Sequence, residues 1–323
     1  MKIAITGGFG FIGSNLVNYL VQKYPDYEFT IIDDVSHYAA HPENVMSALN
    51  LNQYTNIDIN NALVIDEIFN CNNFDGVIHL AAESHVDKSI DDPLRFVKTN
   101  VIGTCNLLEA SRKHGVKRFY QISTDEVFGH LGAEGKFTED TPYAPRSPYS
   151  ASKASADHLV RAYHATYGLP VVLSNCSNNY GPHQDQEKLI PTVIRSILQG
   201  NPIPVYGKGD NVRDWLHVED HCAAIDNIFH EGEIGETYCV GGDNELQNIE
   251  IIEIICEMME KNIEGNPKDL ISYVEDRKGH DFRYAVDCEK LKTKLSWKQN
   301  VYFIEGLRKT IDWYIEKHEK EVN

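Results

Sequence analysis

The stretch MKIAITGGFGFIGS (residues 1–14) decides the fold of this chain. The apolar run at residues 3–5 suits a strand that is buried on both faces, as in a parallel sheet. Gly7, Gly10 and Gly13 follow at three-residue spacing, and apolar residues then recur at helical period from residue 16 to residue 21. Such glycines allow a tight turn, a close approach of backbone to a pyrophosphate, and close packing of helix on strand. The stretch therefore predicts a strand, a phosphate-binding turn and a helix.

A second apolar run at residues 29–32 ends in Asp33, 20 residues after Gly13. An acid at this spacing fits a hydrogen bond to the ribose hydroxyls of an adenosine. Asp34 adds a second negative charge where an NADP site would favour an arginine. An ordinary glycine-rich turn with a surface acid is the alternative, but strand, glycines, helix, strand and acid together indicate an NAD site.

Composition limits the classes of function. The chain has 323 residues and a formal net charge of -18, which argues against nucleic-acid or anionic-membrane binding as the main role. An anionic substrate would then need a local basic pocket. The seven cysteines form no Cys-x-x-Cys pair and the 14 histidines no His-Glu-x-x-His motif, so we expect free thiols and no metal. With no apolar run of membrane length, we expect a cytoplasmic protein.

Strand-like and helix-like segments alternate through the first half of the chain. Strands are predicted near 56–59, 76–82, 118–123 and 171–174, and helices over 63–69, 94–114 and 149–167. This alternation predicts an α/β fold with a doubly wound parallel sheet, the NAD-binding Rossmann type. We place this domain at residues 1–176. Residues 177–323, with candidate helices at 188–199, 218–230, 248–262 and 303–318, are expected to form a smaller α/β substrate-binding region that returns some elements to the first domain.

Two motifs indicate chemistry. Tyr149 and Lys153 share a helix face, so the ammonium can lie near the phenolate and lower the pKa of the tyrosine. Both this cation and the nicotinamide charge would be needed for the tyrosine to act as a base near neutral pH. Thr124, Asp125 and Glu126 follow a predicted strand, where ligands of such sheets bind. Adjacent acids in different environments can serve as acid and base. A surface helix and a solvated acidic loop are the alternative interpretations of these two motifs.

The glycine turn together with Tyr149 and Lys153 resembles the extended short-chain dehydrogenase/reductases. Within them, further blocks resemble the dTDP-glucose 4,6-dehydratases in family order over nearly the whole chain: AAESHVD at 81–87, STDEV at 123–127, NNYGP at 178–182, EKLIP at 187–191, NVRDW at 211–215 and DRKGHD at 276–281.

The resemblance implies an internal redox cycle. Tyr149 would take the proton of the glucose 4-hydroxyl, which Thr124 hydrogen-bonds, while hydride passes from carbon 4 to NAD. Glu126 would remove the acidified proton on carbon 5, and Asp125 would protonate the departing carbon-6 hydroxyl. Return of the hydride to carbon 6 would give a 4-keto-6-deoxy sugar and regenerate NAD.

The resemblance also implies two sets of ligand contacts. The NAD set is Gly7, Gly10, Phe11, Ile12, Gly13, Asp33, Asp58, Ile59, Leu80, Ala81, Ala82, Ser84, Thr99, Tyr149, Lys153 and Asn179. The nucleotide-sugar set is Ser84, Thr124, Asn178, Lys188, Leu189, Tyr206, Arg213, Asn248, Arg277 and His280, in which the two arginines suit a diphosphate.

A few positions depart from the family pattern. Asp34 stands where lysine is frequent, Phe128 where tyrosine is common, and residues 183–186 (HQDQ) where aromatic residues and proline are usual. None of them removes an expected catalytic group.

Two other functions remain to be weighed. A nucleotide-sugar 4-epimerase or decarboxylase on the same scaffold would need no acid–base pair for eliminating water, so Asp125 and Glu126 argue against it. A redox-sensing NAD-binding regulator would be expected to lose Tyr149 or Lys153.

The helices at 94–114 and 149–167 commonly pair across a two-fold axis in this superfamily, so we expect a homodimer that binds dTDP-glucose and neither nucleic acid nor membrane.

Overall fold

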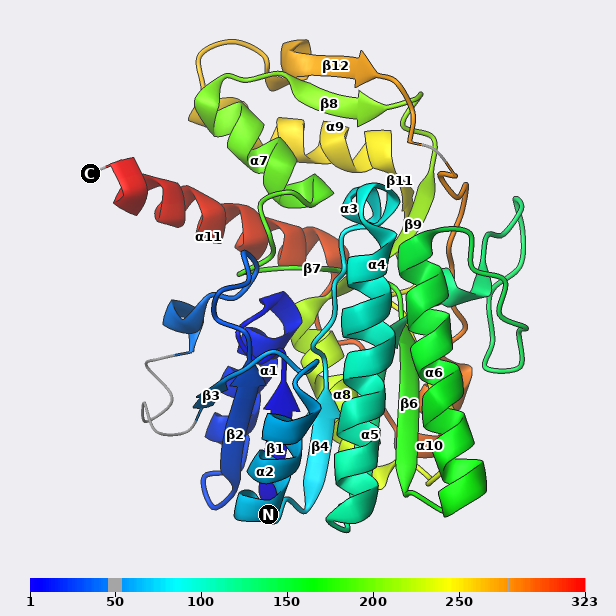
Figure 1. Cartoon of the computed structure of the whole chain (residues 1–323). Coiled ribbons are helices and arrows are strands. Elements are labelled where there is room, and N and C mark those ends of the chain that lie inside the picture. The colour runs from blue at the N-terminus through cyan, green and yellow to red at the C-terminus, as the bar shows by residue number, and fades with distance from the viewer. Residues whose placement is uncertain (46–53, 278, 323) are drawn as a thin grey trace.

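A seven-stranded parallel sheet organises the molecule (Figure 1). The computed structural model describes residues 1–45, 54–277 and 279–322. The sheet has the order β10-β6-β5-β4-β1-β2-β3, and all of its pairings are parallel. Its strands are β1 (Lys2–Thr6), β2 (Glu28–Asp33), β3 (Tyr54–Asn56), β4 (Gly76–His79), β5 (Arg118–Thr124), β6 (Val171–Cys176) and β10 (Thr237–Val240). The predicted doubly wound parallel sheet is confirmed.

Helices cover both faces of this sheet because its strands alternate their apolar side chains between two cores. Ile3 and Ile5 pack in one core with α1 (Phe11–Lys23) and α8 (Val218–Glu231). Ala4 packs in the other core. The helices of that second face are α2 (Ala62–Asn72), α5 (Thr104–Lys113) and α6 (Pro148–Tyr167).

A third core lies above the carboxyl ends of the large sheet's strands (Figure 1). Its helices are α7 (Leu189–Gln199), α9 (Asn248–Met259) and α11 (Phe303–Val322). They pack with two small sheets, β11-β9-β7 and β12-β8, made of β7 (Asn178–Tyr180), β8 (Ile203–Tyr206), β9 (Val212–His217), β11 (Glu245–Gln247) and β12 (Ile271–Val274). The second half also supplies β10, which pairs with β6, and α10 (Glu289–Leu295), which packs near β10.

The helix predicted over 94–114 is not a regular α-helix. Helix α4 (Pro93–Phe96) runs through a π-helical segment, η3 (Val97–Gly103), into α5. Asn100, within the π-helical segment, donates to Ser152 Oγ on α6 (2.8 Å) and accepts from the Glu83 N–H (2.8 Å). The wider turn thus joins α6 to the loop after β4, and such π turns are frequent at functional sites.

The strand predicted at 76–82 is also shorter than expected. It ends at His79, because its neighbour β1 ends at Thr6 and turns away through the glycines. Residues 80–82 therefore lie beyond the sheet edge, followed by the loop to α3 (Val86–Asp91). Within the described residues, no helix is long and apolar enough to span a membrane.

We expect Gly13→Ala to destabilise the protein and to lower its content of bound dinucleotide. A Cβ at this position would lie 2.0 Å from the Gly7 carbonyl oxygen, so the glycine turn must shift. Overpacking of this kind costs about 1–3 kcal/mol of unfolding free energy, measurable by urea denaturation. Gly132→Ala is the matched control, since its Cβ would meet nothing within 4 Å. Equal stability and dinucleotide content in both variants would contradict the close packing.

Candidate active site

The glycine turn after β1 forms a cradle against the end of β4. Gly7 has φ of +69°, and a Cβ there would lie 2.6 Å from the Ala81 nitrogen. Gly13 allows α1 to begin against Gly7 in the same way. At Gly10 a Cβ would lie 3.4 Å from the nearest protein atom, the Gly7 carbonyl oxygen, so packing within the protein does not require glycine there. A phosphate that approaches this backbone at the start of α1 does demand it, which fits a dinucleotide.

Asp33 lies at the end of β2, beside the glycine turn. One of its carboxylate oxygens accepts from the Phe9 N–H (2.8 Å), and burial raises its pKa. An acceptor in this position suits the ribose hydroxyls of an adenosine. The neighbouring Asp34 accepts from Ser36 N–H (3.0 Å), so the departure from lysine is accommodated within a local turn.

A cavity of about 720 Å³ opens at the carboxyl ends of the parallel strands. This volume is in the range of small-molecule and cofactor sites. It is lined by every residue of the predicted NAD set, and also by Thr124, Asp125, Glu126, Asn178 and Lys188. The sequence therefore predicted residues that the fold brings into one place, and the cradle and Asp33 fit an NAD molecule.

Six residues of the predicted nucleotide-sugar set are absent from the described lining of this cavity. They are Leu189, Tyr206, Arg213, Asn248, Arg277 and His280. Leu189 and Asn248 begin α7 and α9, Tyr206 ends β8, Arg213 lies in β9, and the last two precede and follow Gly279. Of the block at 276–281, Lys278 lies outside the described residues.

Helix α6 positions Tyr149 and Lys153. It begins with a capping box at Ser147 and with Pro148 in its first turn, which fixes its start. Lys153 is buried and donates from Nζ to the Ile122 carbonyl oxygen of β5 (2.8 Å). Tyr149, one turn earlier, is buried beside Thr124 and makes a hydrogen bond with it. The helix spacing therefore places both side chains against the end of β5.

Contrary to the expected lowering, the pKa of Tyr149 is raised in this structure, and Lys153 is not among the main causes of its shift. Burial, and then the nearby Glu126 carboxylate, raise the pKa of Tyr149 well above its ordinary value, and the Thr124 hydrogen bond opposes the rise only partly. Lys153 is itself buried, which lowers its pKa, and its proton is directed to Ile122. A cation closer to the phenol is therefore needed before Tyr149 can act as a base.

The two acids after β5 occupy different environments, as the sequence predicted. Asp125 is fully buried, and its Oδ2 has no hydrogen-bond partner among the described residues. Burial, with the neighbouring Glu126 and Asp214, raises the pKa of Asp125 well above its ordinary value. Burial also raises the pKa of Glu126, but Arg213 and Lys188 oppose that rise. Asp125 is thus suited to donate a proton, and Glu126 to accept one.

Cationic side chains gather on the far side of Glu126. Arg213 is buried and donates to the Val212 (2.8 Å) and Asp281 (3.0 Å) carbonyl oxygens. Lys188 donates to the Ser84 carbonyl oxygen (3.1 Å), and burial lowers its pKa. In a chain with a net charge of -18, such a cluster provides a local site for an anionic ligand.

Arg277 joins this cationic group, and it lies against carboxylate and aromatic partners. Its guanidinium pairs with Asp87 and lies 5.2 Å from the centre of the Tyr206 ring. The neighbouring His280 bonds Asp276 through Nδ1 (2.7 Å), and burial lowers its pKa.

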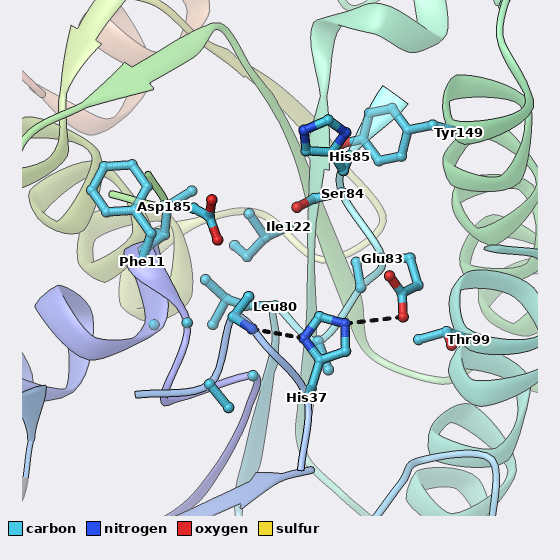
Figure 2. A pocket seen from close by; sticks show the side chains of 18 of the residues that line it. Phe11, His37, Leu80, Glu83, Ser84, His85, Thr99, Ile122, Tyr149 and Asp185 are labelled. Carbon is cyan, nitrogen blue, oxygen red and sulfur yellow. Dashed lines mark hydrogen bonds and ion pairs between the residues drawn. The ribbon is translucent and has the colours of Figure 1, made fainter. Parts of the chain in front are cut away.

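Sequence reasoning missed two supporting groups. Asp157, one turn after Lys153, accepts from Ser123 Oγ (2.7 Å) and supplies a negative charge near the buried ammonium. Glu83 lies at the other end of the cavity, where Figure 2 shows its side chain directed at His37 (3.1 Å). The four-residue spacing of Lys153 and Asp157 was a usable signal, whereas nothing in the sequence joins His37 to Glu83.

The departures from the family pattern are accommodated without disturbing the acids. Phe128 stacks on Phe137, with ring centres 5.0 Å apart, in a small apolar cluster. His183 has φ of +71° and lies 4.9 Å from the Trp313 ring, while Asp185 points into the cavity (Figure 2). No group of side chains in the described part of the chain could hold a metal ion.

Comparison with known proteins gives one consistent result. The sequence model of the family "GDP-mannose 4,6 dehydratase" matches residues 4–310. A dTDP-glucose 4,6-dehydratase of Neisseria meningitidis serogroup B is 47% identical over 98% of this chain and 93% of its own length. One from Xanthomonas campestris is 48% identical over 96% of this chain and 92% of its own.

Solved structures agree with the sequence comparison. A dTDP-glucose 4,6-dehydratase from Streptomyces venezuelae with NAD bound superposes with a TM-score of 0.93 at 40% identity, covering 99% of this chain and 98% of that one. A UDP-glucose 4-epimerase of Thermus thermophilus in complex with NAD has a TM-score of 0.89 at 29% identity, covering 98% and 99%. The scaffold is thus shared with epimerases, and the similarity to dehydratases is greater.

We expect Asp125→Asn to stabilise the ligand-free protein at neutral and higher pH. Folding raises the pKa of Asp125 above its unfolded value of 3.8, so the folded protein holds a proton that the unfolded chain releases. The proton bound by Asp125 therefore contributes its full stabilisation below the unfolded pKa, and this stabilisation is lost as the pH rises through the folded pKa. The loss is about 1.4 kcal/mol for each pH unit that separates the unfolded from the folded pKa.

Urea denaturation of wild type and Asp125→Asn at about pH 4.5 and about pH 8 measures this effect. The unfolding free energy of the wild type should fall further below that of Asp125→Asn at the higher pH. Asp140→Asn removes the same charge from an exposed loop residue and serves as the control. A stability difference that does not change with pH would contradict the buried, protonated state of Asp125.

Proposed function

The chain belongs to the dTDP-glucose 4,6-dehydratase family, and we propose that it converts dTDP-glucose to dTDP-4-keto-6-deoxy-glucose as an NAD-dependent hydro-lyase. Support comes from the full-length similarity and from the cavity that gathers the predicted NAD residues. One observation carries the proposal beyond the shared scaffold. Asp125 and Glu126, in unlike environments, stand beside Tyr149 at the end of β5, as oxidation followed by elimination requires.

The chain's own groups divide the proton transfers among them. Bound NAD supplies the oxidant for carbon 4 and the reductant for carbon 6. Tyr149 takes the 4-hydroxyl proton, with Thr124 hydrogen-bonding the same oxygen. Glu126 then takes the proton from carbon 5, which the new ketone has acidified, while Asp125 delivers its proton to the carbon-6 hydroxyl. One water leaves, and Glu126 returns a proton to carbon 5 as carbon 6 is reduced. The 4-oxygen stays a ketone oxygen, so the proton held by Tyr149 is released and Asp125 takes one up again.

Residues 1–176 in this proposal form mainly the NAD-binding domain, and residues 177–323 mainly the nucleotide-sugar-binding region. Lys188, Arg213 and Arg277 are the cations for the diphosphate, since all three lie near enough to Glu126 to oppose the rise in its pKa. Seven free cysteines agree with a reducing compartment, which supports a cytoplasmic enzyme. The product suits the synthesis of a deoxysugar such as rhamnose.

Incubation with dTDP-glucose and analysis of the sugar by mass spectrometry tests the function. We expect loss of one water without net NADH, and one deuterium at carbon 5 in heavy water. Glu126→Gln should still oxidise carbon 4 and retain NADH, with elimination slowed roughly 10²- to 10⁴-fold, the usual contribution of a general base.

Glu134→Gln changes the same charge in an exposed loop and should leave turnover intact. Recovery of the sugar at unchanged mass, partly as galactose, would support the 4-epimerase instead. No reaction with either dTDP-glucose or UDP-glucose in the presence of NAD would contradict the roles of Asp125 and Glu126.

We also propose that the enzyme is a homodimer joined through α4, η3, α5 and α6. Large apolar side chains are exposed on these helices: Val97 (43% exposed), Ile102 (49%) and Tyr167 (55%). Pairing with the same face of a second copy would remove them from water.

Light scattering at micromolar concentration should give twice the chain mass of 36.6 kDa. The double variant Val97→Asp/Ile102→Asp should dissociate, because it would bury unpaired charges in the interface. Leu63→Asp, on the exposed start of α2, should remain a dimer. A wild-type protein that runs as a monomer would rule the interface out.

A further inference from the structure

An ion pair near Lys188, which lines the site, joins two residues that lie far apart in the chain. Asp87 belongs to α3, beside the first domain's sheet edge, and Arg277 belongs to the segment after β12. The arginine Nε lies 2.6 Å from one carboxylate oxygen, and another guanidinium nitrogen donates to the second oxygen at 2.9 Å. A carboxylate thus lies against the guanidinium that the proposed function assigns to the substrate diphosphate, and it accepts one hydrogen bond from it.

We propose that Asp87 is a specificity-determining residue that competes with the substrate diphosphate for Arg277. This inference rests on the proposed function, because it takes Arg277 as a diphosphate partner. In the free enzyme Asp87 holds the guanidinium, and a nucleoside diphosphate must displace it to bind. Asp87 therefore weakens the binding of every ligand that uses Arg277.

The surroundings of the pair permit this exchange of partners. The side chains of Arg277 and Asp87 are 25% and 37% exposed, so a ligand can reach both. The guanidinium lies over Tyr206, whose ring can support the cation while its hydrogen bonds change partner. Arg213 and Lys188 lie near Glu126 on the same side and add attraction for an incoming anion.

Charge decides which ligand can displace Asp87. A carboxylate carries one negative charge, whereas the diphosphate of a nucleotide sugar carries two and presents more acceptor oxygens to the guanidinium. Two further contacts hold the α3 region against residues 187–188, since Lys88 pairs with Glu187 (2.7 Å) and Lys188 bonds the Ser84 carbonyl oxygen. Release of Asp87 therefore need not open the whole cleft.

Calorimetric titration of the NAD-loaded enzyme with dTDP tests the competition. Asp87→Asn should bind dTDP roughly two- to fivefold more tightly, the effect of removing a partly exposed ion pair. The matched control is Asp91→Asn, which removes the same charge from the same helix and has no ion pair among the described residues. We expect it to bind dTDP as wild type does. Asp87→Ser provides a second variant in case the amide disturbs α3.

A double-mutant cycle tests whether the effect of Asp87 on dTDP binding acts through Arg277. Arg277→Gln should weaken dTDP binding, and Asp87→Asn should add nothing in that background. Uncharged thymidine should bind wild type and Asp87→Asn equally. Equal or weaker dTDP binding by both Asp87 variants would show that Asp87 only orients Arg277 and would overturn the inference. A gain that persists without Arg277, or that extends to thymidine, would overturn it too. A wild-type enzyme that binds no dTDP would overturn the proposed function itself.

Discussion

The buried ammonium of Lys153 fixes the geometry on which the rest of the site depends. An ammonium without water is costly unless its hydrogen bonds are met, and the Ile122 carbonyl oxygen meets one at 2.8 Å. Asp157 supplies a negative charge nearby, itself held by Ser123 on the same strand. Helix α6 is thereby tied to β5 at the point where β5 delivers Thr124 and the two acids. Tyr149 cannot shift along the strand without breaking this contact.

The same parallel sheet explains how one cavity serves both oxidation and elimination. The glycine turn proposed for the dinucleotide follows β1, Asp33, the proposed ribose acceptor, ends β2, and the two acids follow β5, so all three meet at one sheet edge. The cations proposed for the substrate diphosphate lie in the second half of this strongly negative chain, and each already has a partner within the protein. Arg213 is held by backbone carbonyl oxygens and Arg277 by Asp87. Cations held in this way are oriented before the ligand arrives.

Periodicity predicted the elements that pack on the large sheet, because burial on both faces leaves long apolar runs and helical stripes. It did not predict the π-helical turn at η3, since the extra residue per turn leaves no mark on that pattern. Short strands such as β7 and β11, three residues each, were missed for a similar reason. The site residues came from local motifs and family resemblance, whereas contacts such as Arg277–Asp87 depend on how distant segments dock.

The wrong expectation for Tyr149 exposes a constraint that spacing could not show. Four residues on a helix bring Lys153 to the same face, but tertiary packing directs its proton to Ile122. The low-dielectric surroundings that raise the pKa of Asp125, as suits the proposed acid, also raise the pKa of Tyr149, the proposed base. The same buried environment therefore favours proton donation by Asp125 and opposes the ionisation of Tyr149. In the proposed reaction, the positive charge of an oxidised nicotinamide near Tyr149 would oppose this rise in its pKa.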